Sequence, residues 1–184
     1  MQDAAQRYGC AIAGTLVVKE NDQYLNRFYF YKPDGSFAHY DKRHLFGNEK
    51  QLFTAGERRT IVNWKGFRIL LQTCYDLRFP GFSRNRNDYD IALYAASWPS
   101  SRQDAWTTLL KARAIENQCY VLGANRTGDD PYLHYTGGSV AYSFSGALMA
   151  DLEDKVCAKS VEADLHSLTS FRQKFPFLQD ADIY

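Results

Sequence analysis

The sequence predicts a single domain of the α/β layered class. Strand-like segments are joined in pairs by short turns, and a long helical segment separates two apolar strands, which is typical of sheets covered by helices. The chain has 184 residues, close to the roughly 150 of an average domain, and no linker, repeat or low-complexity segment divides it. A chain of this size buries roughly 70% of its unfolded surface, so it needs no disulfide or metal for stability.

Runs of apolar, aromatic and β-branched residues predict the strands of the first half of the chain. Pro33-Asp34-Gly35-Ser36 is typical of a tight turn, because proline fixes φ and glycine allows a positive φ. The run at 11–19 is almost wholly apolar, so we expect a buried strand there. In order, we expect a helix tail over 2–9, strands over 11–19, 27–32, 37–41, 60–64 and 67–73, and an irregular loop over 42–57.

The second half contains a long amphipathic helix over 101–117, because its apolar residues recur at helical spacing. A shorter helix must end before Pro176, since the residue before a proline disfavours the helical conformation. In order, we expect a loop with a short helix over 76–87, buried strands over 90–96 and 119–124, a loop over 125–138, a hairpin of 139–144 and 147–150, a long strand over 156–164 and a helix over 165–174.

Composition and charge exclude several classes of protein. The 22 Lys and Arg against 21 Asp and Glu leave a net charge of +1, which argues against a dedicated nucleic-acid binder. The longest apolar runs, 11–18 and 91–96, are far shorter than the roughly 18 residues that cross a bilayer. The N-terminus has no signal-peptide pattern. We therefore expect a cytoplasmic protein with neither nucleic acid nor membrane as a partner.

Cys74 is a candidate nucleophile, because it follows the strand predicted over 67–73 and precedes a polar loop. Active sites of α/β folds collect at the carboxyl ends of strands, and the N–H groups of such a loop can stabilise a thiolate and an oxyanion. The alternative is a buried cysteine that only fills volume, the commoner state of a free thiol. The four cysteines form no CxxC pair and no zinc-site spacing with histidine, so we expect free thiols and no metal.

Lys42 and Glu49 lie in the loop expected over 42–57. Both can simply be solvated, as most lysines and glutamates are. In the functional alternative Lys42 lies opposite the Cys74 thiol, where its ammonium would stabilise a negative tetrahedral intermediate. His44 is only two residues away, so we expect it to point elsewhere rather than form a Cys–His dyad.

Two further residues are candidates for support of the site. Glu116 closes the long helix, and we expect it to hold the helix end or to pin the loop after the candidate nucleophile. Trp98 follows a strand and can either wall a pocket or pack in the core.

Five segments of the chain form a set of motifs: Tyr40-Asp41-Lys42-Arg43-His44-Leu45-Phe46, Thr54-Ala55-Gly56-Glu57, Cys74-Tyr75-Asp76-Leu77-Arg78-Phe79-Pro80, Ala96-Ser97-Trp98-Pro99 and Lys111-Ala112-Arg113-Ala114-Ile115-Glu116-Asn117-Gln118. Together they resemble the nitrilase superfamily of carbon–nitrogen hydrolases, in the family's order and spacing, and the resemblance runs from about residue 11 to the end of the chain. Asn87-Asp88-Tyr89-Asp90 and the segment 174–182 are similar to the bacterial omega-amidase branch, which hydrolyses the terminal amide of 2-oxo-acid amides such as 2-oxoglutaramate.

The resemblance implies a four-layer α-β-β-α sandwich with two stacked, mostly six-stranded sheets and a Glu–Lys–Cys triad. It makes Cys74 the nucleophile, which releases ammonia and leaves a thioester. It makes Lys42 and the backbone N–H of Tyr75 the stabilisers of the oxyanion. Glu49 matches the family's second glutamate, which orients the lysine and shapes the pocket. The family needs no metal or organic cofactor.

The resemblance also implies a substrate that carries a carboxylate, for which arginine is the best bidentate partner. Arg78 and Trp98 are therefore candidates for substrate binding. Arg78 can equally form a scaffold ion pair with Asp76 or Asp90. Because family members pair their sandwiches through helix faces, we expect a homo-oligomer, a dimer or higher, with the helix over 101–117 and the C-terminal segment as candidate contacts.

The family's general-base glutamate has no match in this sequence. Asp3 and Glu20 are the first acids of the chain, and neither stands in a matching motif. We therefore expect a domain over 1–184 that is incomplete at its N-terminus, lacks the opening strand and first helices, and is inactive or severely impaired alone. The alternatives are a non-catalytic remnant or binding protein with this fold, and a hydrolase of another small C–N substrate such as a nitrile or a carbamoyl compound.

Overall fold

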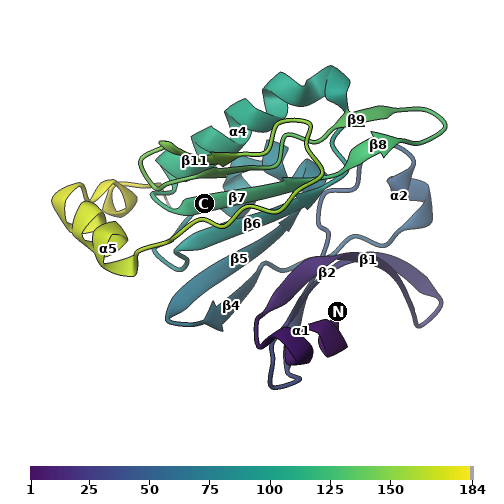
Figure 1. Ribbon diagram of the computed structural model, residues 1–184, viewed down its shortest axis with the longest axis horizontal. Helices are drawn as coiled ribbons and strands as arrows, with labels where there is room; N and C mark the ends of the chain where they lie inside the picture. Colours follow the sequence, from purple (N-terminus) through teal and green to yellow (C-terminus); the bar gives the residue numbers. More distant parts are fainter. Residues whose placement is uncertain (183–184) are drawn as a thin grey trace.

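Two β-sheets lie face to face between helices in the computed structural model, which describes residues 1–182 (Figure 1). The larger sheet has six strands in the spatial order β11 (Leu148–Asp151), β10 (Val140–Tyr142), β7 (Tyr120–Asn125), β6 (Ile91–Ala96), β5 (Phe67–Thr73) and β4 (Thr60–Trp64). The smaller sheet has the order β1 (Ile12–Glu20), β2 (Gln23–Tyr31) and β3 (Phe37–Asp41), and β8 (Thr127–Asp129) pairs with β9 (His134–Thr136). The helices are α1 (Gln2–Tyr8), α2 (Glu49–Leu52), α3 (Pro80–Ser83), α4 (Gln103–Glu116) and α5 (Leu165–Lys174), with 3₁₀ turns at Cys74–Arg78, Ser100–Arg102 and Phe177–Gln179.

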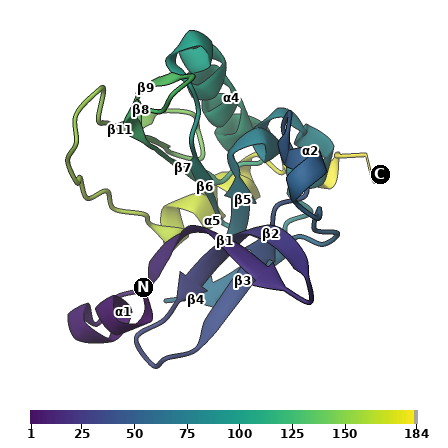
Figure 2. The same cartoon turned by 90° about the vertical axis from the view of Figure 1, so that its right-hand side faces the viewer.

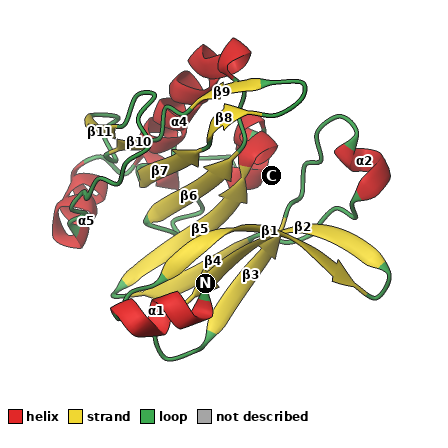
Figure 3. Ribbon diagram, turned by 45° about the vertical axis from the view of Figure 1, so that its right-hand side comes forward, coloured by secondary structure: helices red, strands yellow, loops and turns green. Residues whose placement is uncertain are grey.

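The layers follow the order α-β-β-α, as expected. Alternate residues of β5 point to opposite faces, so Leu70 packs in the core that includes Trp106 and Leu110 of α4, while Leu71 packs with Phe28 of the smaller sheet. The smaller sheet therefore covers the face of the larger sheet opposite α4, and α1 lies against the outer side of β1 (Figures 2 and 3). The prediction of an α/β layered fold is confirmed.

Strands β5, β6 and β7 are parallel neighbours at the centre of the larger sheet. Parallel strands have their carboxyl ends at the same edge, so the loops that follow β5, β6 and β7 gather there. The loop between β3 and β4, which contains α2, reaches the same edge, as Figure 1 shows. This edge carries Cys74.

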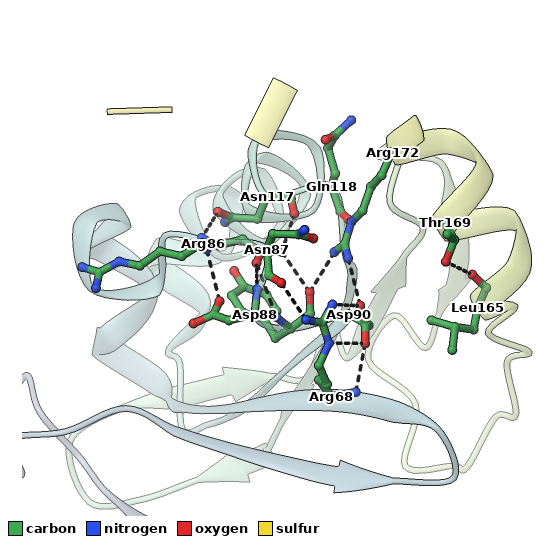
Figure 4. Close-up of polar contacts among 12 residues, drawn as sticks. Arg68, Arg86, Asn87, Asp88, Asp90, Asn117, Gln118, Leu165, Thr169 and Arg172 are labelled. Carbon is green, nitrogen blue, oxygen red and sulfur yellow. Dashed lines mark hydrogen bonds and ion pairs between the residues drawn. The ribbon is translucent and has the colours of Figure 1, made fainter. Parts of the chain in front are cut away.

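At the opposite edge of the same strands, α5 is tied to the sheet through Asp90, the residue before β6 (Figure 4). Its carboxylate accepts hydrogen bonds from Arg68 of β5 and from Arg172 of α5, at 2.7 Å and 2.9 Å. Arg172 also donates to the carbonyl oxygens of Tyr89 and Gln118. These bonds fix the C-terminal helix against the start of β6.

The structure corrects two strand predictions. The segment 11–19 is a strand, but it is not buried: β1 is an edge strand, and Leu16 and Val17 are 50% and 64% exposed. The segment 156–164 is not a strand, because no ladder partner lies beside it within the described residues. A strand needs a neighbour as well as suitable residues, and the neighbour is not encoded locally.

Two expected loops contain short elements. The loop over 42–57 holds α2, and the loop over 125–138 holds the β8–β9 hairpin. The smaller sheet has three strands, fewer than a six-stranded sheet that lacks only its opening strand would have. No helix among residues 1–182 is long and apolar enough to cross a membrane.

Candidate functional site

Cys74 lies where β5 ends and a 3₁₀ turn begins. Its φ is +47°, in the left-handed region that non-glycine residues rarely adopt and that is often found at functional sites. The N–H of Thr73 donates to Asp76 Oδ2 at 2.9 Å, which holds the turn closed. Sγ lies 3.9 Å from the carbonyl oxygen of Ser97, at the end of β6. The strained turn therefore presents the thiol between two neighbouring strand ends.

Lys42 follows β3 and is only 3% exposed. Its Nζ donates to Glu49 Oε2 at 2.5 Å. Glu49 also accepts hydrogen bonds from the side-chain amide of Asn26 at 3.1 Å and from the backbone N–H of Phe46 at 2.7 Å. A buried ammonium persists only if its charge is balanced. Glu49 supplies that balance, and three donors hold the carboxylate in place.

The Lys42 loop and the Cys74 turn are joined by Asp76, which is fully buried. Its carboxylate accepts hydrogen bonds from the hydroxyl of Tyr40 at 2.8 Å and from the backbone N–H of His44 at 3.0 Å. The ring of His44 also contacts this carboxylate and stacks on Phe79. His44 therefore points away from the thiol, as expected, and fastens the loop to the turn.

Two cavities, of about 270 and 300 Å³, meet at Cys74. These volumes lie at the small end of the roughly 300–1,000 Å³ of small-molecule sites. Lys42, Glu49, Asn26 and Tyr135 line the first cavity, and Tyr75, Arg78 and Trp98 line the second. The residues that line both are Phe46, Cys74, Ser97, Pro99 and Arg102. The structure thus brings the thiol, the lysine and Glu49 to one cavity.

Burial raises the pKa of the Cys74 thiol above its ordinary value, and the positive charge of Lys42 opposes this only in part. The thiol is therefore protonated at neutral pH and needs a base to become a nucleophile. Among the described residues that line the two cavities, Glu49 is the only carboxylate. It already accepts three hydrogen bonds, so it is poorly placed to take the thiol proton.

Glu116 supports the site indirectly, through Arg113. Its Oε1 accepts a hydrogen bond from Arg113 Nη1 at 2.8 Å, and Nη2 of the same guanidinium donates to the carbonyl oxygen of Leu77 at 2.6 Å. Leu77 lies in the 3₁₀ turn that starts at Cys74. Glu116 is thus connected to the turn after Cys74 through Arg113.

Trp98 and Arg78 lie together on the wall of the 300 Å³ cavity. Trp98 is buried, and its indole N–H donates to the carbonyl oxygen of Arg102 at 2.7 Å. The Arg78 guanidinium lies over the indole ring, 5.1 Å from its centroid. Asp76 and Asp90 are bound by other groups, so neither forms an ion pair with Arg78 in the described part of the chain.

Sequence reasoning missed three residues of the site: Asn26, Arg102 and Tyr135. Asn26 lies on β2 and Tyr135 on β9, and no local pattern connects either of them with Cys74. Arg102 stands four residues after Trp98, so its position just beyond the motif that contains Trp98 is the one sequence feature that points to it. In residues 1–182 no group of three or more His, Cys, Asp or Glu side chains is arranged to hold a metal.

Comparison with known proteins gives the family. The profile of the carbon–nitrogen hydrolases matches residues 1–173. Omega-amidase YafV of Yersinia enterocolitica is 47% identical in a match that covers 96% of this chain and 70% of the relative. The 2-oxoglutaramate amidase of Bacillus subtilis is 31% identical in a match that covers 100% of this chain and 74% of the relative. A solved structure is also similar: the crystal structure of XC1258 from Xanthomonas campestris, a CN-hydrolase superfamily protein with an arsenic adduct in the active site. The match has a TM-score of 0.97 and 41% identity, and it covers 100% of this chain and 73% of the XC1258 chain. The chain belongs to the carbon–nitrogen hydrolase family.

Proposed function

We propose that this carbon–nitrogen hydrolase acts on small linear amides, and that its substrate is the terminal amide of a 2-oxo-acid amide such as 2-oxoglutaramate. One observation carries the proposal: the buried ammonium of Lys42, held by Glu49, lines the same cavity as the Cys74 thiol. The substrate class rests on similarity to an omega-amidase and to a 2-oxoglutaramate amidase.

In the proposed reaction the Cys74 sulfur bonds to the amide carbonyl carbon, and the carbonyl electrons move onto oxygen. Lys42 and the N–H of Tyr75 stabilise this oxyanion. Tyr75 lies in the first turn of the 3₁₀ segment, where N–H groups have no acceptor within the helix. The intermediate expels the amide nitrogen as ammonia and leaves a thioester, which water cleaves to a carboxylate and the free thiol.

The proton balance limits the rate of this chain. The thiol must lose a proton before attack, and ammonia must gain one on leaving. Lys42 Nζ donates to Glu49, and the Glu49 carboxylate is occupied by three donors. General-base assistance contributes about 10²–10⁴-fold, so we propose that the 184-residue chain is severely impaired at neutral pH by a factor of this size.

The test measures ammonia release from 2-oxoglutaramate by the purified chain and by its Cys74→Ala variant, from pH 7 to pH 9.5. The omega-amidase of Yersinia enterocolitica serves as the fully active reference. We expect a weak activity that depends on Cys74 and rises with pH, because hydroxide can take up the thiol proton. A rate within tenfold of the reference at pH 7 would contradict the impairment. If no ammonia release depends on Cys74 at any pH in this range, the result would contradict the amidase function and favour a binding role.

We also propose that the chain forms a homo-oligomer through the outer face of α4 or the C-terminal segment. Ile115 on α4 and Phe177 are both exposed, which leaves apolar surface on these elements. Gel filtration at micromolar concentration is expected to give at least a dimer. A monomer at that concentration would contradict this proposal.

A further inference from the structure

Among the described residues that line both cavities, Arg102 is the only charged one. It lies in the 3₁₀ turn Ser100–Arg102 that leads from β6 into α4. The shared lining also contains Cys74, so Arg102 and the thiol belong to the boundary where the two cavities join. A small molecule bound at the thiol therefore has Arg102 among the residues of its cavity wall.

The charge of Arg102 is not matched by a carboxylate within the described residues. Its guanidinium lies over the ring of Phe46, 5.1 Å from the centroid, and its backbone carbonyl accepts the indole N–H of Trp98. The other cation of the first cavity, Lys42, is paired with Glu49. A half-buried guanidinium beside an aromatic ring, with its planar donors unused, is well suited to a carboxylate.

We propose that Arg102 binds the distal carboxylate of the substrate and so selects amides that carry a negative charge at the far end. This inference rests on the proposed function, in which Cys74 attacks the amide end. It assigns to Arg102 the role that the sequence suggested for Arg78. Arg78 is exposed and lines only the cavity without Lys42, whereas Arg102 lines the wall that both cavities share.

The first test compares two substrates that differ in one charge: glutaramate, a monoamide with a terminal carboxylate, and glutaramide, its neutral diamide. In Arg102→Gln we expect KM for glutaramate to rise about 10–100-fold, because the substrate loses a charge-assisted hydrogen-bonded contact. The kcat for glutaramate and all parameters for glutaramide are expected to change less than threefold. Arg102→Lys keeps the charge and is expected to recover part of the loss.

A second measurement needs no turnover and so separates this inference from the proposed function. Glutarate, a dicarboxylate of matching length, is expected to slow the alkylation of Cys74 by iodoacetamide in the unmodified chain and in Arg7→Gln, but not in Arg102→Gln. Arg7→Gln is a matched control, because Arg7 also lies over an aromatic ring but is on α1, outside both cavities.

Each outcome decides the inference. It is overturned if glutarate protects Arg102→Gln as well as the unmodified chain, if protection is lost in Arg78→Gln but kept in Arg102→Gln, or if glutaramide protects Cys74 as well as glutarate. Protection that depends on Arg102, with no ammonia released from any amide, supports the anion site and contradicts the hydrolase function.

Discussion

Lys42–Glu49 and Asp90–Arg172 are ion pairs in which Lys42 and Asp90 are almost fully buried, and they lie at opposite ends of the same parallel strands. At Asp90, arginines approach from two elements, and the carboxylate accepts four hydrogen bonds from Arg68 and Arg172 together (Figure 4). At Lys42, the ammonium has three N–H groups, and Glu49 is its one hydrogen-bond partner in the described residues. Lys42 also lines a cavity with a thiol.

The difference shows what separates an ion pair that only stabilises the fold from one that takes part in a reactive site. Around Asp90 the acceptor positions are filled by the protein itself, so the cluster can only fasten α5 to the sheet. Around Lys42 the carboxylate is filled but the ammonium keeps free donors toward a cavity. Burial and charge alone do not distinguish the two pairs, but unused donors beside a nucleophile do.

The largest expected effect that tests this distinction is on catalysis. Lys42→Gln removes the ammonium proposed to stabilise the oxyanion, and we expect kcat/KM for 2-oxoglutaramate at pH 9 to fall about 10²–10³-fold. Lys19→Gln is the control, because Lys19 forms an exposed ion pair with Asp22 on the smaller sheet. If kcat/KM falls less than threefold in Lys42→Gln, the result would contradict a role of Lys42 in stabilising the oxyanion.

The matching change at the other end of the sheet acts on stability. Asp90→Asn leaves the guanidinium of Arg172 without its carboxylate, and we expect the free energy of unfolding to fall by about 3 kcal/mol. Urea titration measures this loss. The kcat/KM of the folded protein is expected to stay unchanged, since Asp90 lies at the edge opposite Cys74. A tenfold loss of kcat/KM in this variant would show that the two ends are coupled.

A smaller effect sharpens the comparison through the thiol. Because burial raises the pKa of Cys74, we expect its rate of alkylation by iodoacetamide to rise with pH through a midpoint above the 8.5 or so of a free thiol. Since the charge of Lys42 lowers this pKa, the midpoint is expected to lie higher in Lys42→Gln. A midpoint below about 8 would contradict the dominant effect of burial, and a midpoint that the substitution leaves unchanged would contradict the electrostatic influence of Lys42 on the thiol.

The smallest expected effect is the pH dependence of the Asp90 cluster. Burial opposes ionisation of Asp90, but hydrogen bonds and charge from Arg68 and Arg172 outweigh it and hold the pKa of this carboxyl below its usual value. The stability that ionised Asp90 contributes is therefore complete above its unfolded pKa of about 3.9 and is lost as the pH falls through the lower, folded value. The stability difference between the unmodified chain and Asp90→Asn should shrink below pH 4, as acid titration in urea would show. A constant difference between pH 7 and pH 2.5 would contradict this assignment.

Elements with local signals were predictable from the sequence. The strands 37–41, 60–64 and 67–73 and the helix 165–174 have the bounds expected for them, because turn residues or a proline stand at their ends. The exposure of β1 and the absence of a strand over 156–164 depend on neighbours, and no residue within those segments reveals them.

The same division holds for the site. Cys74 and Lys42 stand in recognisable motifs, so the amino-acid sequence alone singles out both. The contacts that position them were not predictable: Asn26 reaches Glu49 across 23 residues, and Asp76 reaches Tyr40 across 36. Such contacts arise from strand pairing and loop packing, which bring together residues that no short pattern relates.

The most direct test of the proposed chemistry is mass spectrometry of the chain quenched with acid during incubation with 2-oxoglutaramate at pH 9. We expect an added mass equal to the substrate minus ammonia, on the peptide that contains Cys74, with less adduct in Lys42→Gln. Cys119 is fully buried with a pKa raised to about 12, so it should stay unmodified. An adduct on Cys10 or Cys157 instead, or a Cys74→Ala variant that releases ammonia at the unmodified rate, would contradict a reaction that proceeds through Cys74.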